Sequence, residues 1–240
     1  MKSPYFVRET DSSNYLLKKL IGLEVLPEFF AVRTAFQTAG KGQAGNSWES
    51  AAGQNLLCSI LLYPHNIPLD KHFVLSQIVS LAVVELLHSK GVECKIKWPN
   101  DIYWNDKKIA GILIENSLRS NRIESSIVGI GLNVNQMKFE SDAPNPVSLR
   151  QIIAKKWPVA QLLKELIDFI QMIYKWDIMQ VQQVYIERMY RFGSIHLFKI
   201  PGGETFKARI AQVELYGQLK LDLLNGQIAG YYFKEIEFVI

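Results

Sequence analysis

The segment Gly40-Lys41-Gly42-Gln43-Ala44-Gly45 lies between two stretches with the patterns of β-strands. Alternation over Phe29–Phe36 predicts a strand that leads straight into the glycines, and the apolar run Asn55–Tyr63 predicts a buried strand after them. The glycine segment is therefore predicted to connect two strands. Three glycines and one lysine allow backbone N–H groups to approach an anion such as phosphate. A flexible surface turn has the same composition.

Read literally, the segment is Gly-x-Gly-x-x-Gly, the spacing found in dinucleotide-binding sites. That motif opens a helix and is followed by an acidic residue about 20 positions later. Here a strand follows instead, and no Asp or Glu lies between Glu49 and Asp70. No kinase-type His-Arg-Asp or Asp-Phe-Gly sequence follows either. The pattern therefore disfavours dinucleotide-binding and kinase folds.

The chain has 240 residues, of which 48% are hydrophobic, so it can bury a substantial core. Length alone allows one large domain, or one large domain with a small one. The net charge of +4 is mild, and basic residues are scattered among acidic ones. No basic stripe therefore predicts extended nucleic-acid binding, whereas a small anionic ligand is compatible with this charge.

The cysteines and the N-terminus bear on the compartment. Cys58 lies in an apolar run and Cys94 in a short alternating stretch, without Cys-x-x-Cys spacing, so we expect two buried, reduced thiols. The first residues lack the apolar region of a signal peptide, and no apolar run approaches the roughly 18 residues of a membrane span. We expect a cytoplasmic protein without a membrane partner.

The middle of the chain combines one helix with several strands. Leu69–Lys90 has apolar residues at helical spacing, which predicts a helix with Asp70 as its N-cap and Gly91 as its C-terminal stop. Short strand-like segments separated by polar turns follow this helix. These segments are Glu93–Trp98, Ile102–Trp104, Lys108–Asn116 and Ile123–Val134. They predict a mixed sheet formed in part by hairpins.

The periodicity changes in the last third of the chain. From Pro158 to about Arg191 the apolar spacing is helical, and beyond Gly193 it alternates, with turns such as Tyr216-Gly217 and Asn225-Gly226. This change predicts an α+β chain with two parts, residues 1–191 and a small all-β domain of residues 192–240. Because no Ser/Gly-rich linker separates them, we expect the two parts to pack closely.

Three further segments contain residue types that suit a nucleotide. In Lys97-Trp98-Pro99-Asn100-Asp101, the Asn can pair with the edge of adenine and the Asp can hold Mg²⁺. In Lys107–Glu115, Lys108 stands before an apolar strand, where its charge can bridge a phosphate and a carboxylate. In Ser126–Asn135, glycines inside a strand indicate a close approach by backbone or ligand. Taken alone, each segment also fits an ordinary turn or strand.

Together with Asp11-Ser12-Ser13-Asn14, these segments resemble the catalytic domain of biotin-protein ligases in wording and order. That family has Gly-Arg/Lys-Gly-Arg-x-Gly followed by Trp, then Lys-Trp-Pro-Asn-Asp, then Lys-φ-Ala-Gly-Ile-Leu-φ-Glu, where φ is apolar. The resemblance covers roughly residues 5–135 of this chain. It implies a mixed-sheet, class II synthetase-like fold of the biotin/lipoate-ligase kind, and the family's small SH3-like β-barrel matches the pattern after Gly193.

The resemblance also implies roles for individual residues. The residues implied at the biotin site are Ser12, Ser13, Asn14, Gln37, Gly40, Lys41, Gly42, Gln43, Lys108 and Gly129. The residues implied at the nucleotide are Trp48, which would cover adenine, and Asn100 and Asn133, which would bind its edge. Lys41, Asp101 and Lys108 are the implied catalytic residues, and Asp101 would also serve the metal. An N-cap role for Ser12 or Asp11, and a core role for Trp48, are the competing explanations.

The implied activity joins biotin to a protein lysine at the expense of ATP. The biotin carboxylate attacks the α-phosphate of Mg-ATP, pyrophosphate leaves, and the acceptor amine then attacks the biotinyl-adenylate. Asp101 is a candidate base for this second step, and loop closure would exclude water. ATP, Mg²⁺ and biotin are the implied ligands. The implied partner is the biotin carboxyl carrier domain of a biotin-dependent carboxylase, and a homodimer is compatible with the family.

This chain departs from the family pattern at one position of the loop. Many relatives carry Arg where this chain has Gln43, so one cation that would grip the adenylate phosphate is missing. Near the end of the chain, where relatives sometimes carry a basic residue that reaches the nucleotide, only Lys234 is available. We therefore expect adenylate retention to differ from that of relatives with Arg.

Other functions fit the sequence less well. A lipoate- or octanoate-protein ligase shares the fold, but its usual Arg-Arg-x-x-Gly-Gly-Gly segment is absent. A non-catalytic biotin-sensing regulator would need a DNA-binding helix-turn-helix before Asp11, and we expect none and no DNA partner. The four histidines have no metal-ligand spacing, and no Gly-x-Ser-x-Gly occurs. Zinc enzymes and hydrolases are therefore disfavoured.

Overall fold

The computed structural model describes residues 4–140 and 145–240. The first elements are β1 (Tyr5–Thr10), α1 (Ser13–Leu23), β2 (Ala31–Gln37), the 3₁₀ turn η1 (Gln43–Gly45), β3 (Leu56–Leu62), the 3₁₀ turn η2 (Leu69–Lys71), α2 (Phe73–His88), β4 (Lys95–Lys97), β5 (Asp101–Trp104), β6 (Lys107–Arg119) and β7 (Arg122–Leu132). The remaining elements are α3 (Leu149–Ile153), α4 (Val159–Ile173), α5 (Ile178–Glu187), β8 (Ile195–Lys199), β9 (Thr205–Val213), β10 (Leu219–Asp222), β11 (Ile228–Tyr231) and β12 (Glu237–Phe238).

Strands β1 to β7 form one mixed sheet in the order β1-β2-β3-β7-β6-β5-β4. Within the described residues, β1 and β2 are the only parallel pair of this sheet, and every other neighbouring pair is antiparallel. Asn105 takes a positive φ of 50° in the turn between β5 and β6, a conformation that Asn tolerates better than most residues. The predicted mixed sheet with hairpins is confirmed.

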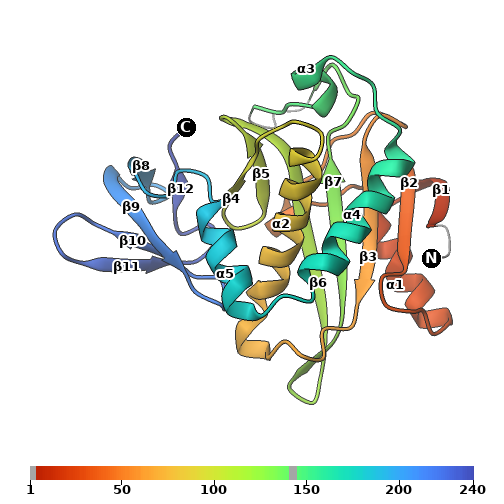
Figure 1. Cartoon of the computed structure of the whole chain (residues 1–240), viewed down its shortest axis with the longest axis horizontal. Helices are drawn as coiled ribbons and strands as arrows, with labels where there is room; N and C mark the ends of the chain where they lie inside the picture. The colour runs from red at the N-terminus through yellow and green to blue at the C-terminus, as the bar shows by residue number, and fades with distance from the viewer. Residues whose placement is uncertain (1–3, 141–144) are drawn as a thin grey trace.

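Helices cover both faces of the seven-stranded sheet (Figure 1). On β3, Ile60 belongs to the large apolar core that includes α2 and α4, whereas the next residue, Leu61, packs with Leu17 of α1. Successive side chains of a strand point to opposite faces, so α1 lies on the face opposite α2 and α4. Burial on both faces explains why β3 is apolar throughout rather than alternating.

Helix α2 runs through the centre of the core, but its start differs from the prediction. The chain first makes the 3₁₀ turn η2, so Asp70 lies before the helix, and the N-cap is His72 without a side-chain hydrogen bond. The predicted stop is confirmed. Gly91 has a φ of 80°, its N–H donates to the His88 carbonyl at 2.8 Å, and the Val92 N–H donates to the Leu87 carbonyl at 3.0 Å.

By length and composition alone, one helical stretch among the described residues, the 20 residues Leu69–His88, could cross a membrane. The sequence analysis expected no membrane-spanning segment, because no uninterrupted apolar run is long enough, and this finding differs from that expectation. In the fold, 72% of its most apolar window is buried inside the protein, where α2 packs against α4, α5 and the sheet. A helix that is apolar on all sides is found in the core of a large domain as well as in membranes.

The predicted helical region from Pro158 consists of two helices, α4 and α5, because Asp177 starts a new helix by accepting hydrogen bonds from the Met179 and Gln180 N–H groups. Strands β8 to β12 then form an antiparallel sheet in the order β11-β10-β9-β8-β12. This sheet lies beside α5 and β4 at the left of Figure 1. Trp98 Nε1 donates to the Gly217 carbonyl at 3.0 Å, so the expected close packing is confirmed.

Candidate functional site

A cavity of about 680 Å³ lies between the glycine loop, the start of α1, the turn around Asn100 and the strands β6 and β7. It opens on the α1 face of the seven-stranded sheet, because Gly129 and Gly131 alternate with the core residues Val128 and Ile130 along β7. The predicted site residues that line it are Ser12, Asn14, Gln37, Lys41, Gly42, Gln43, Trp48, Asn100, Asp101, Lys108, Gly129 and Asn133.

The glycine loop forms a short hairpin over this cavity. Lys41 and Ser47 pair as an isolated bridge, and the Gly42 N–H donates to the Asn46 carbonyl at 2.7 Å. The Trp48 N–H donates to the Gly40 carbonyl at 3.0 Å. A Cβ on Gly40 would lie 2.6 Å from the Trp48 carbonyl oxygen, so only glycine fits there. Gly40 thus allows the loop to close on itself, and it is not among the residues that line the cavity.

Trp48 lies against two glycines that face each other across β6 and β7. Gly111 and Gly131 are register partners, and a Cβ on Gly131 would lie 2.4 Å from the indole Cε2. A Cβ on Gly111 would lie 2.9 Å from Cζ3. The missing side chains thus make room for an aromatic ring, as expected for glycines inside strands. Trp48 is half-buried and lines the cavity, so it is not a plain core residue.

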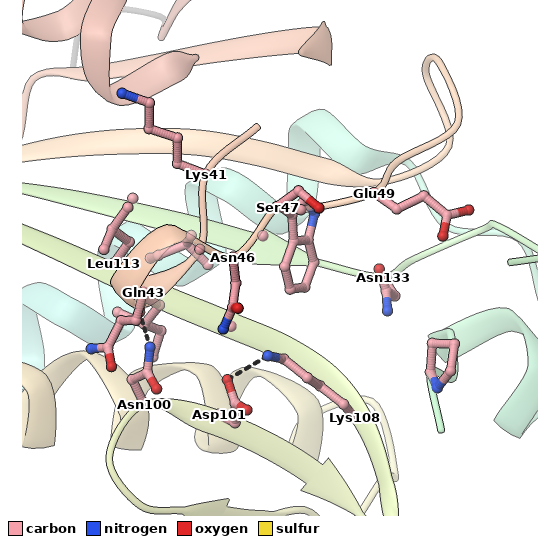
Figure 2. A pocket seen from close by; sticks show the side chains of 18 of the residues that line it. Lys41, Gln43, Asn46, Ser47, Glu49, Asn100, Asp101, Lys108, Leu113 and Asn133 are labelled. Carbon is pink, nitrogen blue, oxygen red and sulfur yellow. Dashed lines mark hydrogen bonds and ion pairs between the residues drawn. The ribbon is translucent and has the colours of Figure 1, made fainter. Parts of the chain in front are cut away.

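Asp101 and Lys108 form an ion pair inside the cavity, with 2.6 Å between Lys108 Nζ and Asp101 Oδ1. The hairpin of β5 and β6 brings the two residues together. Both side chains are largely buried, and Lys108 Nζ also lies 5.6 Å from the centre of the Trp48 ring. Figure 2 shows Asn46 of the loop pointing toward this pair. A partly desolvated ammonium is well placed to neutralise an incoming anion.

The two loop residues predicted beside Lys108 lie elsewhere in the cavity. In Figure 2 the amine of Lys41 points away from the ion pair, on the far side of the loop, while Gln43 lies close to Asn100. Lys41 is also exposed to solvent. In this conformation the Lys41 ammonium therefore does not join the Asp101–Lys108 pair, although both lysines line the cavity.

Lys97 is a second cation of the cavity that the sequence analysis did not assign to the site. Burial lowers its pKa from the ordinary lysine value; Asp101 opposes this shift, and Lys108 adds to it. Its Nζ lies 5.1 Å from the centre of the Tyr103 ring. The sequence contained a signal for this role, because Lys97 is the first residue of the five-residue segment that contains Asn100 and Asp101.

The two predicted adenine ligands differ in their hydrogen bonding. Asn100 Nδ2 donates to the Ile112 carbonyl at 2.5 Å, and the Ile112 N–H donates back to the Asn100 carbonyl at 3.0 Å, so Asn100 ties the turn to β6. Asn133 is 4% exposed, and its Oδ1 has no hydrogen-bond partner among the described residues. A buried acceptor without a partner is uncommon, and it fits a donor supplied by a ligand.

The start of α1 forms the opposite end of the cavity. Ser12 caps the helix, since its side chain accepts from the Tyr15 N–H at 3.4 Å, which confirms the competing explanation for this residue. Ser12 nevertheless lines the cavity as well. Ser13 does not line it, but its N–H donates to Gln37 Oε1 at 2.8 Å. The chain thus anchors α1 on β2 beside the cavity.

A network of buried amides, which no sequence motif indicated, supports the loop behind Trp48. Gln136 Oε1 accepts from Asn55 Nδ2 at 2.6 Å and from the Ala51 N–H at 2.9 Å, and Gln136 Nε2 donates to Glu49 Oε1 at 3.2 Å. Asn55 Oδ1 accepts from the Val134 N–H at 2.9 Å. These bonds join the segment after Trp48 to the end of β7, where Asn133 lies.

Neither a metal cluster nor a reactive thiol is found in the part of the chain that the structure describes. No group of three or more His, Cys, Asp or Glu side chains within residues 4–140 and 145–240 is arranged to hold a metal ion. Cys58 and Cys94 are buried and free, as predicted, and burial raises the pKa of each thiol to about 12. Both thiols are therefore inert near neutral pH.

A large concave cavity lined by cations, amides and glycine backbone is typical of a domain that binds an anionic small molecule. Residues 5–133 match the model of the biotin/lipoate A/B protein ligase family, and the chain belongs to this family. The matched residues include the glycine loop, the turn around Asn100 and the strands β6 and β7 that form the cavity.

Individual relatives agree with this assignment. The chain is 42% identical over 111 residues to the bifunctional ligase/repressor BirA of Bacillus subtilis, covering 46% of this chain and 34% of that protein. It is 29% identical over 197 residues to the biotin--[acetyl-CoA-carboxylase] ligase of Mycobacterium tuberculosis, covering 78% of this chain and 71% of that protein. The match to the first of these relatives thus spans about a third of its length.

Among solved structures, the fold is similar to that of the biotin protein ligase from Aquifex aeolicus in complex with biotin and ATP. The TM-score is 0.79 with 24% sequence identity, and the match covers 99% of this chain and 98% of that chain. The likeness therefore extends over both sheets, including the five-stranded one after α5. This agreement confirms the predicted α+β fold with a small β part at its end.

Proposed function

We propose that this protein is an ATP-dependent biotin-protein ligase. The observation that carries the proposal is the cavity itself, of about 680 Å³. It joins the Asp101–Lys108 ion pair, the polar start of α1 and Asn133, whose Oδ1 has no partner among the described residues. That volume lies within the range of roughly 300–1,000 Å³ for small-molecule sites. The likeness to the ligases of Mycobacterium tuberculosis and Aquifex aeolicus supports biotin and ATP as the ligands.

In the proposed first step, a carboxylate oxygen of biotin forms a bond to the α-phosphorus of ATP. The bond from that phosphorus to the oxygen that bridges it to the β-phosphate breaks, and pyrophosphate leaves. Both reactants are anions, so the main task of the protein is to reduce their repulsion. Lys108, oriented by Asp101, is the residue we assign to this task, and Lys97 is a second cation of the same cavity.

Reactions of this kind use ATP as its Mg²⁺ complex. The cavity is compatible with that ion. Mg²⁺ is usually held by one or two carboxylates together with phosphates and water. Asp101 supplies one carboxylate in the cavity, which fits an ion that arrives with the triphosphate. We assign Asp101 to hold it; when bound, the ion would neutralise charge on the phosphates.

In the proposed second step, the ε-amine of an acceptor lysine attacks the carbonyl carbon of the biotinyl-adenylate. The bond from that carbon to the phosphate oxygen breaks, AMP leaves, and the amine loses a proton. Asp101 is the candidate base, and the loop with Trp48 excludes water from the anhydride. We propose the carrier domain of a biotin-dependent carboxylase as acceptor, and the reduced, buried cysteines support a cytoplasmic location.

The activation step is tested by exchange of labelled pyrophosphate into ATP. We expect exchange with biotin, and no exchange above background with lipoate or octanoate. The neutral amides and hydroxyls at the α1 end of the cavity, Asn14, Gln37 and Ser12, suit a cyclic urea better than an aliphatic chain. Exchange that depends on lipoate or octanoate but not on biotin would instead assign the chain to the lipoate branch of the family.

A further inference from the structure

Ser59, Gly129 and Leu113 form a row across three strands beneath the start of α1. Ser59 of β3 is the register partner of Gly129 of β7, which is in turn the partner of Leu113 of β6. Asn14, the second residue of α1, lies above the middle of this row. A Cβ on Gly129 would lie 2.4 Å from Asn14 Oδ1, so glycine makes room for the Asn14 amide.

Both ends of the Asn14 amide are hydrogen-bonded to the sheet. At one end, Ser59 Oγ lies 2.6 Å from Asn14 Oδ1. At the other end, Asn14 Nδ2 lies 2.6 Å from Glu115 Oε2 and 3.4 Å from the Leu113 carbonyl oxygen. Ser59 is fully buried within a strand that is otherwise apolar, where a hydroxyl is costly unless it is hydrogen-bonded.

These contacts determine which way the amide points. A carboxylate can only accept, so Nδ2 must face Glu115, and Oδ1 then faces Ser59. Because an amide oxygen can only accept, the single proton of the Ser59 hydroxyl goes to Oδ1, and the Ser13 hydroxyl, 2.8 Å away, donates to Ser59 Oγ. Both protons of Nδ2 are used by Glu115 and Leu113, and one of the two lone pairs of Oδ1 is used by Ser59. The second lone pair of Oδ1 is what Asn14 can offer to a ligand in the cavity, which Asn14 lines.

We propose that Ser59 and Glu115 are positioning residues, which lock the Asn14 amide so that it presents a hydrogen-bond acceptor rather than a donor to the substrate. This inference rests on the proposed function, because a ring N–H of the cyclic urea of biotin is the donor that such an acceptor selects. Lipoate and octanoate have no N–H group in the corresponding part of the molecule. Ser59 and Glu115 would thereby contribute to the choice of acyl substrate.

The experiment compares Ser59→Ala and Glu115→Ala with Ser126→Ala as a matched control. Ser126 is also fully buried in the same sheet, and its hydroxyl also bonds a side-chain amide, Asn116 Oδ1 at 2.7 Å, but it does not line the cavity. Biotin binding is measured by titration calorimetry, KM for ATP by pyrophosphate exchange, and stability by thermal unfolding.

We expect Ser59→Ala and Glu115→Ala each to weaken biotin binding by roughly threefold to tenfold, the effect of losing one hydrogen bond. KM for ATP should not change, and Ser126→Ala should bind biotin like wild type although it loses similar stability. Because Ser59 acts through Asn14, the double variant Asn14→Ala/Ser59→Ala should bind no more weakly than Asn14→Ala alone.

Several results would overturn the inference. Wild-type protein that binds no biotin would refute both this inference and the proposed function. If wild type binds biotin, and the Ser59 and Glu115 variants bind it equally well, only the positioning role is refuted. Additive losses in the double variant would also refute it. If Ser59→Ala does not fold, Glu115→Ala decides, because Glu115 is exposed and its replacement leaves the core intact.

Discussion

The charged residues of the cavity differ in how they are held. Lys108 is paired with Asp101 at 2.6 Å and has 28% of its side chain exposed. Lys41 is exposed, and its amine points away from that pair. An ammonium that is already oriented and partly desolvated stabilises developing charge without further reorganisation. Lys108 is therefore the residue on which the activation step should depend most.

Lys108→Ala should lower biotin-dependent pyrophosphate exchange by about 100-fold to 1,000-fold, the range observed when one preorganised electrostatic group is removed. The protein should remain folded, because Lys108 lines an open cavity and is not part of the apolar core. Lys107→Ala is the matched control: Lys107 is the exposed neighbour in β6 and does not line the cavity. Equal exchange rates for the two variants would exclude the assigned role.

Gly131 tests the contact between β7 and the aromatic ring of the loop. A Cβ at this position would lie 2.4 Å from the indole, so Gly131→Ala must displace Trp48. Overpacking of this kind costs about 1–3 kcal/mol, and we expect KM for ATP to rise about tenfold. Gly22→Ala is the control, since a Cβ there meets no atom within 4 Å. An unchanged KM in Gly131→Ala would contradict the placement of Trp48 at the nucleotide.

The cysteines provide a prediction about pH. With a pKa of about 12, only about one Cys58 or Cys94 thiol in ten thousand is ionised at pH 8, so a thiol reagent should not label the native protein. Labelling should increase only as the pH rises toward 12, and both thiols should react at pH 8 after unfolding in urea. Rapid labelling of native protein at pH 8 would show that the thiols are not buried.

At the scale of elements, the buried amide Gln136 connects the loop after Trp48 with the end of β7. Gln136→Ala would leave Asn55, Glu49 and the Ala51 N–H without this partner. We expect a loss of about 1–3 kcal/mol in the free energy of unfolding, measured in urea, and a higher KM for ATP. Gln183→Ala, on the exposed side of α5, should change stability by less than about 0.5 kcal/mol. Equal stabilities of the Gln136→Ala and Gln183→Ala variants would contradict the role of Gln136 in joining the loop to β7.

Strands and helices with strong periodicity could be predicted, and those with weak local signals could not. The apolar run of β3 and the helical spacing of α2 predicted both elements, whereas β1 and the short helix α3 were not predicted. The helix α1 was indicated only by the alternative N-cap role of Ser12 or Asp11. β1 lies at the sheet edge, where it is mostly exposed and carries no clear alternation. The N-cap of α2 was misplaced at Asp70, because the chain makes a 3₁₀ turn at Leu69–Lys71 before the α-helix begins.

The candidate site shows the same division. Residues in recognisable segments, such as Asn100, Asp101 and Lys108, were predicted and lie together in the cavity. Ser59 and Gln136 were not predicted, because a single polar residue in a strand or loop has no local pattern. Their partners are 45 and 81 positions away along the chain, and only folding brings them together.

At the scale of the whole molecule, the five-stranded sheet packs against the turn that carries Asn100 and Asp101. Trp98 donates to the Gly217 carbonyl, and Phe233 of this C-terminal part lines the cavity, whereas Lys234 does not. Buried residues of both sheets belong to one continuous core, so we expect the two parts to unfold together.

The most direct test of the account is transfer of biotin to a carboxyl carrier domain. Purified protein is incubated with ATP, Mg²⁺, biotin and the carrier domain, and the carrier is analysed by intact mass. We predict the addition of one biotin to one lysine, with AMP and pyrophosphate formed in equal amounts, and no addition when that lysine is replaced by Arg. A carrier that stays unmodified, while ATP and biotin remain unconsumed, would contradict the assignment as a biotin-protein ligase.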